Sequence, residues 1–215
     1  LAMPWVKENA DALLVQWYAG EQQGCTLADI LLGKVNPSGK LNVSFPRSTG
    51  NTPCFYNHFV TDREESFDQP GTPEEPKGHY IFDKPEPLWN FGHGKSYTTF
   101  DYVDCALSDT LLAASDTLKV SVMIKNTGRC DGKEVVQLYV RDKVSTVATP
   151  IQQLKAFQKV LIKPGESQCV ELSLPIAELA LYNAKMEEVV EPGDFEIQIG
   201  AASDDIRFKK TITIN

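Results

Sequence analysis

Hydrophobic and polar residues alternate along most of the C-terminal half of the chain. In TLKVSVMIKN at 117–126, every second residue from Leu118 to Ile124 is apolar, which is the two-residue period of a half-buried β-strand. Alternation or a short apolar run predicts strands at 100–107, 117–126, 134–142, 154–162, 168–174, 194–200 and 206–214. Turn-forming stretches such as KPGES and EPGD separate these segments, so the half is predicted to be all-β.

About seven short strands, with turns every 8–12 residues or so, are typical of an immunoglobulin-like or fibronectin-III-like β-sandwich. The cysteine–tryptophan–cysteine spacing of true immunoglobulin domains is missing, so we predict the fibronectin-III-like form for residues 100–215. Alternation places one set of residues on the inward face of each strand. The expected core residues are Val120, Val122, Ile124, Val136, Leu138, Val140, Leu172, Leu174, Ile197 and Ile199.

The N-terminal stretch mixes extended and helical patterns. Residues 4–10 favour a short helical turn, and ALLVQWY at 12–18 is a continuous apolar run suited to a strand buried on both faces. Residues 21–32 place apolar side chains at helical spacing, and LNVSF at 41–45 alternates like a strand. Strand, helix and strand in this order are typical of a parallel sheet. Residues 1–50 are therefore predicted to be the C-terminal part of an α/β sandwich domain, which makes the whole chain mainly β.

Residues 51–99 follow neither period. They are rich in proline, glycine and acidic residues, which predicts an irregular connection between the two regular parts. At its end, PLWNFGHGKSYTTF at 87–100 sets aromatic residues among glycines. This composition favours an aromatic junction that is held against a neighbouring surface.

Charge and cysteine content narrow the possible partners. The chain of 215 residues has 29 acidic and 21 basic residues and a net charge of −8, which disfavours nucleic acid and anionic membrane surfaces. No apolar run approaches the roughly 20 residues that a membrane-spanning helix needs. The five cysteines include no Cys-x-x-Cys pair, so no zinc site is indicated, and we expect no metal or cofactor. The opening LAMPWVKENA carries no signal segment, and we expect it to be a cut within a longer protein.

The turn GEQQG, which follows the predicted strand at 12–18, raises the question of a ligand site. Glu21 would lie at the strand's C-terminal end, where open α/β sheets bind ligands. A glutamate in the first turn of a helix is also stabilised by the helix dipole alone, and we favour this interpretation. Trp17 and Trp89 could stack on sugar rings, although aromatic residues beside glycines also hold domains together. Trp17, Glu21 and Trp89 are thus the candidate substrate-binding residues, and no catalytic residue is predicted.

Other polar residues give a weaker signal. The irregular connection contains the acids Asp62, Glu64, Glu65, Asp68, Glu74 and Glu75. A solvated acidic loop is the favoured interpretation, because no spacing typical of a calcium loop is present. His58, His79 and His93 are too scattered for a metal site, and His93 is expected to pack in the junction.

Three longer motifs resemble the family 3 glycoside hydrolases, especially the bacterial β-glucosidase type, over nearly the whole chain. ADALLVQWYAGEQQGCTLADILLGKVNPSGKLNVSFPRS resembles the end of that family's second, α/β sandwich domain. PLWNFGHGKSYTTFDY resembles the family's junction, with Lys95 where leucine is usual. KNTGRCDGKEVVQLYVRD, LKAFQKVLIKPGES and EPGDFEIQIGAAS are similar to its fibronectin-III-like domain.

The resemblance implies a function. Family members are retaining glycoside hydrolases, whose chemistry uses two carboxylates roughly 5–5.5 Å apart. In the family the nucleophile lies on an N-terminal barrel and the acid/base earlier in the second domain, which implies that neither is in this chain. We therefore expect the C-terminal portion of an exo-acting β-glycosidase, inactive alone, packed against the upstream barrel and α/β domains of a periplasmic or secreted parent that acts on glycosides.

Two other functions are compatible with a β-sandwich, namely a free-standing carbohydrate-binding or adhesion module and a structural spacer. Half of an α/β sheet would leave an open edge in an independent adhesin, and the strands at 117–142 offer only Tyr139 as an aromatic residue. The glycosidase hypothesis is therefore favoured. In the isolated chain, we expect residues 12–18 to be buried on the sandwich or in a homodimer.

Overall fold

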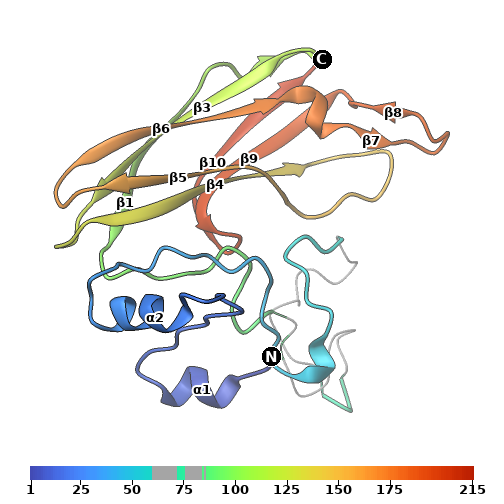
Figure 1. Cartoon of the computed structure of the whole chain (residues 1–215). Helices are drawn as coiled ribbons and strands as arrows, with labels where there is room; N and C mark the ends of the chain where they lie inside the picture. The colour runs from blue at the N-terminus through green and yellow to red at the C-terminus, as the bar shows by residue number, and fades with distance from the viewer. Residues whose placement is uncertain (60–71, 76–83, 85) are drawn as a thin grey trace.

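The computed structural model describes residues 1–59, 72–75, 84 and 86–215. Within these residues the C-terminal half is a β-sandwich of two main sheets (Figure 1). The smaller sheet has the order β1-β3-β6 and the larger one β2-β10-β9-β4-β5. The smaller sheet is formed by β1 (Phe100–Leu107), β3 (Thr117–Asn126) and β6 (Ser167–Pro175). The larger sheet is formed by β2 (Leu111–Leu112), β4 (Gly132–Asp142), β5 (Gln153–Ile162), β9 (Gly193–Ala202) and β10 (Asp205–Ile214).

All seven strands expected from residue 100 onward are confirmed. β1 and β3 have the predicted bounds, and the others differ by one or two residues at an end, which is normal for strand boundaries. The structure adds β2, a 3-10 helix η3 (Ile176–Leu179) and a hairpin of β7 (Leu181–Tyr182) and β8 (Glu188–Val189). A strand of two residues carries no measurable period, so these short strands could not be predicted.

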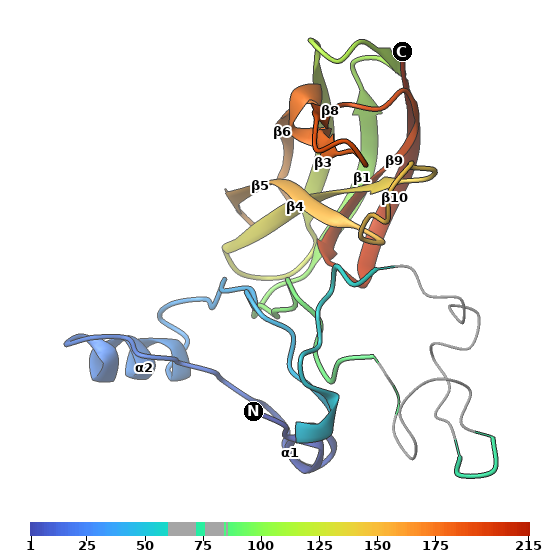
Figure 2. The same ribbon diagram turned by 90° about the vertical axis from the view of Figure 1, so that its right-hand side faces the viewer.

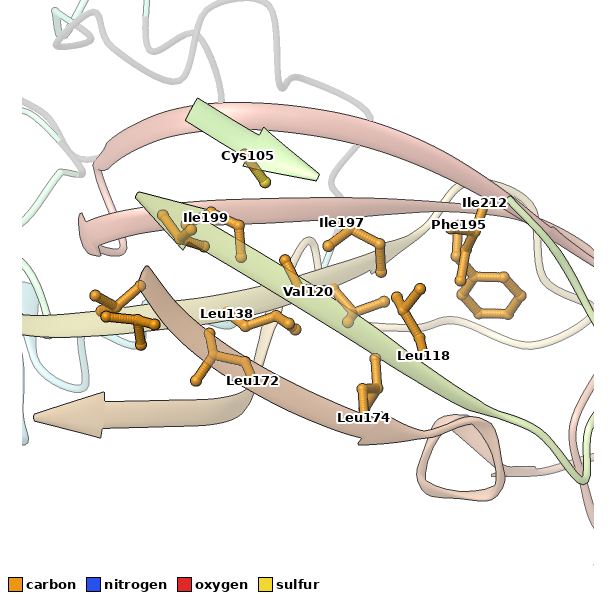
Figure 3. Packing of buried hydrophobic residues seen from close by; sticks show 14 of the residues in the cluster. Cys105, Leu118, Val120, Leu138, Leu172, Leu174, Phe195, Ile197, Ile199 and Ile212 are labelled. Atoms are coloured by element: carbon orange, nitrogen blue, oxygen red, sulfur yellow. The ribbon is translucent and has the colours of Figure 1, made fainter. Parts of the chain in front are cut away.

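The predicted core is confirmed as well. Every inward residue named above is at most 4% exposed, and the side chains of the two sheets meet between the layers (Figure 3). Leu118, Phe195, Ile212 and Cys105 belong to the same cluster. Because burying one valine, leucine or isoleucine side chain stabilises a protein by about 1.5–3 kcal/mol, this core stabilises the sandwich.

The N-terminal part has the predicted helices but not the predicted strands. α1 (Pro4–Asn9) and α2 (Gln23–Leu31) are present, and a 3-10 helix η1 (Thr49–Asn51) follows. The strands predicted at 12–18 and 41–45 are wrong: the first has no strand structure, and the second contributes only an isolated bridge between Phe45 and Trp89. A strand exists only when a neighbour pairs with its backbone, and the described residues offer 12–18 none.

The helices lie away from the sandwich. Figure 2 shows α1 and α2 apart from the two sheets, with the later part of the N-terminal half between them and the sandwich. Among the described residues, no helix has the length and apolar character needed to cross a membrane.

Candidate functional site

The most elaborate polar and aromatic contacts lie where residues 36–59 and 86–99 meet the sandwich, a region that we call the junction. At its centre is the turn of the FGHG sequence. The N–H of Gly92 donates to the carbonyl of Leu41 at 2.7 Å, and the N–H of Leu41 donates to the carbonyl of His93 at 2.8 Å. Gly92 has φ +82°, and a Cβ there would collide with the side chain of Gln137. The turn therefore requires glycine both for its backbone angle and for its close approach to the sandwich.

A buried ion pair joins the junction to β4. Lys40 Nζ lies 3.2 Å from Glu134 Oε1, and the two side chains are 15% and 6% exposed. The hydroxyl of Tyr102 donates to the same carboxylate at 3.2 Å, and Lys40 also donates to the carbonyl of Gly94 at 3.0 Å. Burial raises the pKa of Glu134, and the positive charge of Lys40 opposes this rise. Burial and the nearby Glu134 raise the pKa of Tyr102. The side chains of Lys40 and Glu134 are therefore both largely enclosed by the surrounding described residues.

Aromatic and amide side chains cover the outer face of β4 beside this pair. Gln137 donates to the carbonyls of Ala201 at 2.5 Å and Gly92 at 3.4 Å, and it accepts from the hydroxyl of Tyr139 at 2.6 Å. Tyr56 stacks on Phe91 with ring centroids 4.2 Å apart, and its ring meets Tyr139 edge-on at 5.9 Å. Tyr139 is fully buried. It therefore belongs to the junction and cannot form an exposed sugar-binding strip.

Asn36 links three parts of the chain through one side chain. Its amide nitrogen donates to the carbonyl of Asp131 at 2.8 Å, while its amide oxygen accepts from the Ser96 hydroxyl and the Tyr97 N–H, both at 2.8 Å. The NPSGK stretch, which contains Asn36 and Lys40, has the composition of a turn, and neither residue is among the candidates named from the sequence. The signal was present, because a polar residue on either side of a Pro-Ser-Gly turn can bond outward while the turn fixes its position.

The structure brings two of the three candidate substrate-binding residues to one aromatic cluster. Trp17 stacks on Phe45 with centroids 6.0 Å apart, and Phe45 meets Trp89 edge-on at 6.0 Å. Lys7 lies 5.6 Å from the centroid of the Trp89 ring and donates to the Leu88 carbonyl at 2.6 Å. Phe45 itself is buried, whereas the Trp17 side is open.

Glu21 does not join this cluster. It is exposed in the turn before α2, and no hydrogen bond or ion pair connects it with another described residue. The role of Trp17, Glu21 and Trp89 in substrate binding stays a prediction.

The remaining polar candidates divide by location. Asp62, Glu64, Glu65, Asp68 and His79 lie outside the described residues. Glu74 and Glu75 are exposed, and His58 is half-buried. In the part of the chain that the structure describes, no three histidine, cysteine, aspartate or glutamate side chains are grouped so as to hold a metal ion.

His93 packs in the junction, as expected, and is half-buried. Burial lowers its pKa, the carboxylate of Asp204 opposes this effect, and the positive charges of Lys40, Lys95 and Lys7 add to it. Asn90 donates to the same Asp204 at 2.7 Å. Below its pKa, His93 would add a further positive charge to a region that already has three lysines.

A small cavity lies in the sandwich, lined by residues of β4, β5, η3 and β9. Its volume is about 50 Å³, far below the roughly 300–1,000 Å³ of ligand pockets. Among the described residues, Glu134 is the acidic residue whose whole side chain is buried, and it is paired with Lys40.

Two protein-family models match the chain. The glycosyl hydrolase family 3 C-terminal domain matches residues 1–97, and the fibronectin type III-like domain matches residues 134–203. A "Beta-xylosidase" of Formosa agariphila is 40% identical over 209 residues, which are 96% of this chain and 28% of that protein. A "Periplasmic beta-glucosidase" of Salmonella typhimurium is 39% identical over 94% of this chain and 26% of its own length.

Solved structures give the same result. The crystal structure of a β-glucosidase from Listeria innocua in complex with glucose has a TM-score of 0.87 and 37% identity, and the match covers 100% of this chain and 29% of that one. A β-glucosidase from Erythrobacter marinus has a TM-score of 0.84 and 38% identity over 98% of this chain. The chain spans between 21% and 28% of the length of the curated relatives that it matches.

Proposed function

The chain belongs to glycoside hydrolase family 3 and corresponds to the C-terminal part of its members, and on that premise we propose that it is the scaffold portion of a retaining, exo-acting β-glycosidase. The activity that we propose for the whole protein is hydrolysis of O-glycosidic bonds. Residues 1–50 would complete an α/β domain, and residues 100–215 would form the fibronectin-III-like domain. Residues 51–99 would connect these two domains.

One observation supports a scaffold role for this chain and a catalytic role for other parts of the enzyme. Retaining hydrolysis needs two carboxylates about 5–5.5 Å apart and open to the sugar. Glu134, the acidic residue with the most completely buried side chain among those described, is paired with Lys40 at 3.2 Å inside the junction. We therefore assign this carboxylate to packing, and we propose that the catalytic pair lies in parts of the family that this chain does not span.

The names of the relatives support a substrate class and a location. They include β-glucosidases and β-xylosidases, which makes a β-glucoside or a β-xyloside the proposed substrate. The Salmonella typhimurium relative is named periplasmic, and this supports our proposal of a periplasmic or secreted parent. The proposed partners are the barrel and α/β domains of that parent.

A chimera tests the proposal. In the Listeria innocua β-glucosidase, the stretch that matches this chain is replaced by residues 1–215, and hydrolysis of an aryl β-glucoside is measured. We expect kcat within about tenfold of the parent enzyme, because a loss of that size corresponds to only about 1.4 kcal/mol of transition-state stabilisation. The same chimera with Gly92→Ala, which disturbs the junction, is the variant in which we expect kcat to fall. A folded chimera without measurable turnover contradicts the proposal.

A further inference from the structure

Residues 17–22 form a short loop whose two ends are joined. The side-chain amide of Gln16 donates to the carbonyl of Gln23 at 2.9 Å, so the residue before the loop contacts the first residue of α2. Gly20 has φ +71°, and a Cβ there would meet open space. All of the loop residues are exposed. The loop is therefore fixed at its base and open to solvent.

Trp17 begins this loop with a strained backbone. Its φ of +43° lies in the left-handed region, which bulky side chains rarely adopt. Backbone strain of this kind is concentrated at functional sites. The indole stacks on Phe45, with ring centroids 6.0 Å apart and ring planes at 13° to each other. Phe45 is buried, whereas Trp17 is 56% exposed, so one face of the indole contacts protein and the rest of the ring meets solvent.

Glu21 has no partner for its charge among the described residues. The interpretation of Glu21 as a first-turn residue of a helix is wrong, because α2 begins at Gln23 and Gln22 is its N-cap. No hydrogen bond or ion pair joins the Glu21 carboxylate to another described residue. A carboxylate has roughly four positions that accept hydrogen bonds, and a ligand can reach all of them at Glu21.

Trp89, the third candidate for substrate binding, is used for packing instead. The edge of the Phe45 ring meets it at 6.0 Å, and the Lys7 ammonium lies 5.6 Å from its ring centroid. Its backbone forms a bridge with Phe45, and its side chain is only partly exposed. The contacts that surround Trp89 thus leave less of its ring open than is open at Trp17.

We propose that the loop 17–22 is a saccharide subsite, in which the Trp17 indole stacks on a pyranose ring and the Glu21 carboxylate accepts hydrogen bonds from sugar hydroxyls. A pyranose has an apolar face of C–H groups and a rim of hydroxyl donors, and an open aromatic ring near an unpaired carboxylate matches both. Four peptide units separate the two residues, so their Cα atoms are at most about 14 Å apart. A neutral saccharide fits better than an anionic one, which Glu21 and the net charge of −8 would repel.

The subsite would hold the leaving part of the substrate. The inference rests on the proposed function, in which the catalytic carboxylates lie outside this chain. In retaining hydrolysis the sugar whose bond is cleaved lies between those carboxylates. An exo-acting enzyme removes the terminal sugar, so the remaining saccharide extends beyond them. Contacts with this part contribute binding energy without taking part in bond cleavage. The loop would therefore favour a saccharide over a small leaving group.

Two substrates test the inference on the chimera described above. Laminaribiose, which has been crystallised with a mutant of the Listeria innocua enzyme, leaves a sugar, whereas methyl β-glucoside leaves only methanol. We expect Trp17→Ala and Glu21→Ala each to lower kcat/KM for laminaribiose about tenfold, mainly through KM, since one such contact corresponds to about that factor. For methyl β-glucoside, kcat/KM should stay within about twofold of the unsubstituted chimera. Trp17→Phe should keep most of the activity on laminaribiose.

Matched controls come from α1. Trp5 is 71% exposed and Glu8 is exposed as well, and neither belongs to the loop. Trp5→Ala and Glu8→Ala should leave the ratio of the two kcat/KM values unchanged. Equal losses on both substrates in the Trp17→Ala variant would mean that Trp17 only packs against the rest of the enzyme. That result, or unchanged kinetics, overturns the subsite and leaves the proposed function intact.

If the chimera hydrolyses neither substrate, the proposed function is contradicted and the isolated chain decides on the subsite. Nuclear magnetic resonance would follow the indole N–H signals of its three tryptophans during addition of laminaribiose. The Trp17 signal, identified by its loss in Trp17→Phe, should shift progressively, while those of Trp5 and Trp89 stay in place. A Trp17 signal that does not move, or that moves together with the other two, overturns the inference.

Discussion

At the scale of single residues, the ion pair between Lys40 and Glu134 joins the junction to the sandwich, and we expect the stability of the chain to depend on it. Two charges are withdrawn from water there, and each is tolerable only because the other is 3.2 Å away. We expect Lys40→Met to lower the free energy of unfolding by about 3–5 kcal/mol, because it leaves Glu134 buried without its partner. The double variant Lys40→Met with Glu134→Leu should cost less than the sum of the two single changes. Urea unfolding of the variants measures these values.

An exposed pair supplies the control for this cycle. Lys209 Nζ lies 3.4 Å from Glu196 Oε1 on the sandwich, and the Lys209 side chain is 58% exposed. Lys209→Met should change the free energy of unfolding by less than about 1 kcal/mol, as is usual for solvated ion pairs. If Lys40→Met is equally mild, the buried pair does not hold the junction.

His93 should make the stability of the chain depend on pH. Its pKa in the folded state is lowered from 6.5, so the unfolded chain takes up a proton more readily than the folded one in the interval below that value. The free energy of unfolding therefore falls as the pH drops through this interval. His93→Gln removes this dependence. Between pH 7.5 and 5, the wild type should lose more stability than the variant, and equal losses would mean that the residue titrates normally.

At the scale of elements, the FGHG turn shows why the junction needs its glycines. Gly92 and Gly165 both have positive φ, +82° and +76°, but a Cβ at Gly92 would meet Gln137 whereas one at Gly165 would meet open space. We expect Gly165→Ala to cost about 1–2 kcal/mol, the left-handed penalty alone. Gly92→Ala should cost clearly more, since the turn must also move away from β4. Melting temperatures of the two variants give the comparison, and equal shifts would refute the steric part.

The elements also show which features can be predicted from sequence. Alternation in TLKVSVMIKN identified β3 with its correct bounds, because the period of a strand is a local property. The predicted strand at 12–18 has the composition of a strand but no neighbour among the described residues, and pairing is not local. The contact of Lys40 with Glu134 also joins distant parts of the sequence. Neither sequence segment, taken alone, indicates that Lys40 and Glu134 form a pair.

At the scale of the whole molecule, the proposed scaffold role predicts that the isolated chain has no hydrolytic activity. The isolated chain should not hydrolyse aryl β-glucosides or β-xylosides above background, because hydrolysis without the second carboxylate loses either the nucleophile or the proton donor. Glu21→Gln should leave this background unchanged. Turnover by the purified chain that is lost in the Glu21→Gln variant would place part of the catalytic pair at the turn before α2.

The packing further predicts that the isolated chain behaves as two unequal parts. Polar contacts of Lys40, Asn36 and Gln137 tie residues from 36 onward to the sandwich. Residues 1–35 are held mainly by the contacts of Lys7, by the stacking of Trp17 on Phe45 and by the hydrogen bond from Tyr97.

Hydrogen exchange in the isolated, monomeric chain should follow this division. Amides of β3, β4 and β9 should exchange slowest, because they open only with the whole sandwich. Leu41 and Phe45, whose amides are hydrogen-bonded to residues 93 and 89, should exchange nearly as slowly as the sandwich. Amides of residues 11–19 should be faster by several powers of ten, since no described backbone group accepts from them. Equal protection of residues 11–19 in a monomer would show that the N-terminal part has a complete core of its own.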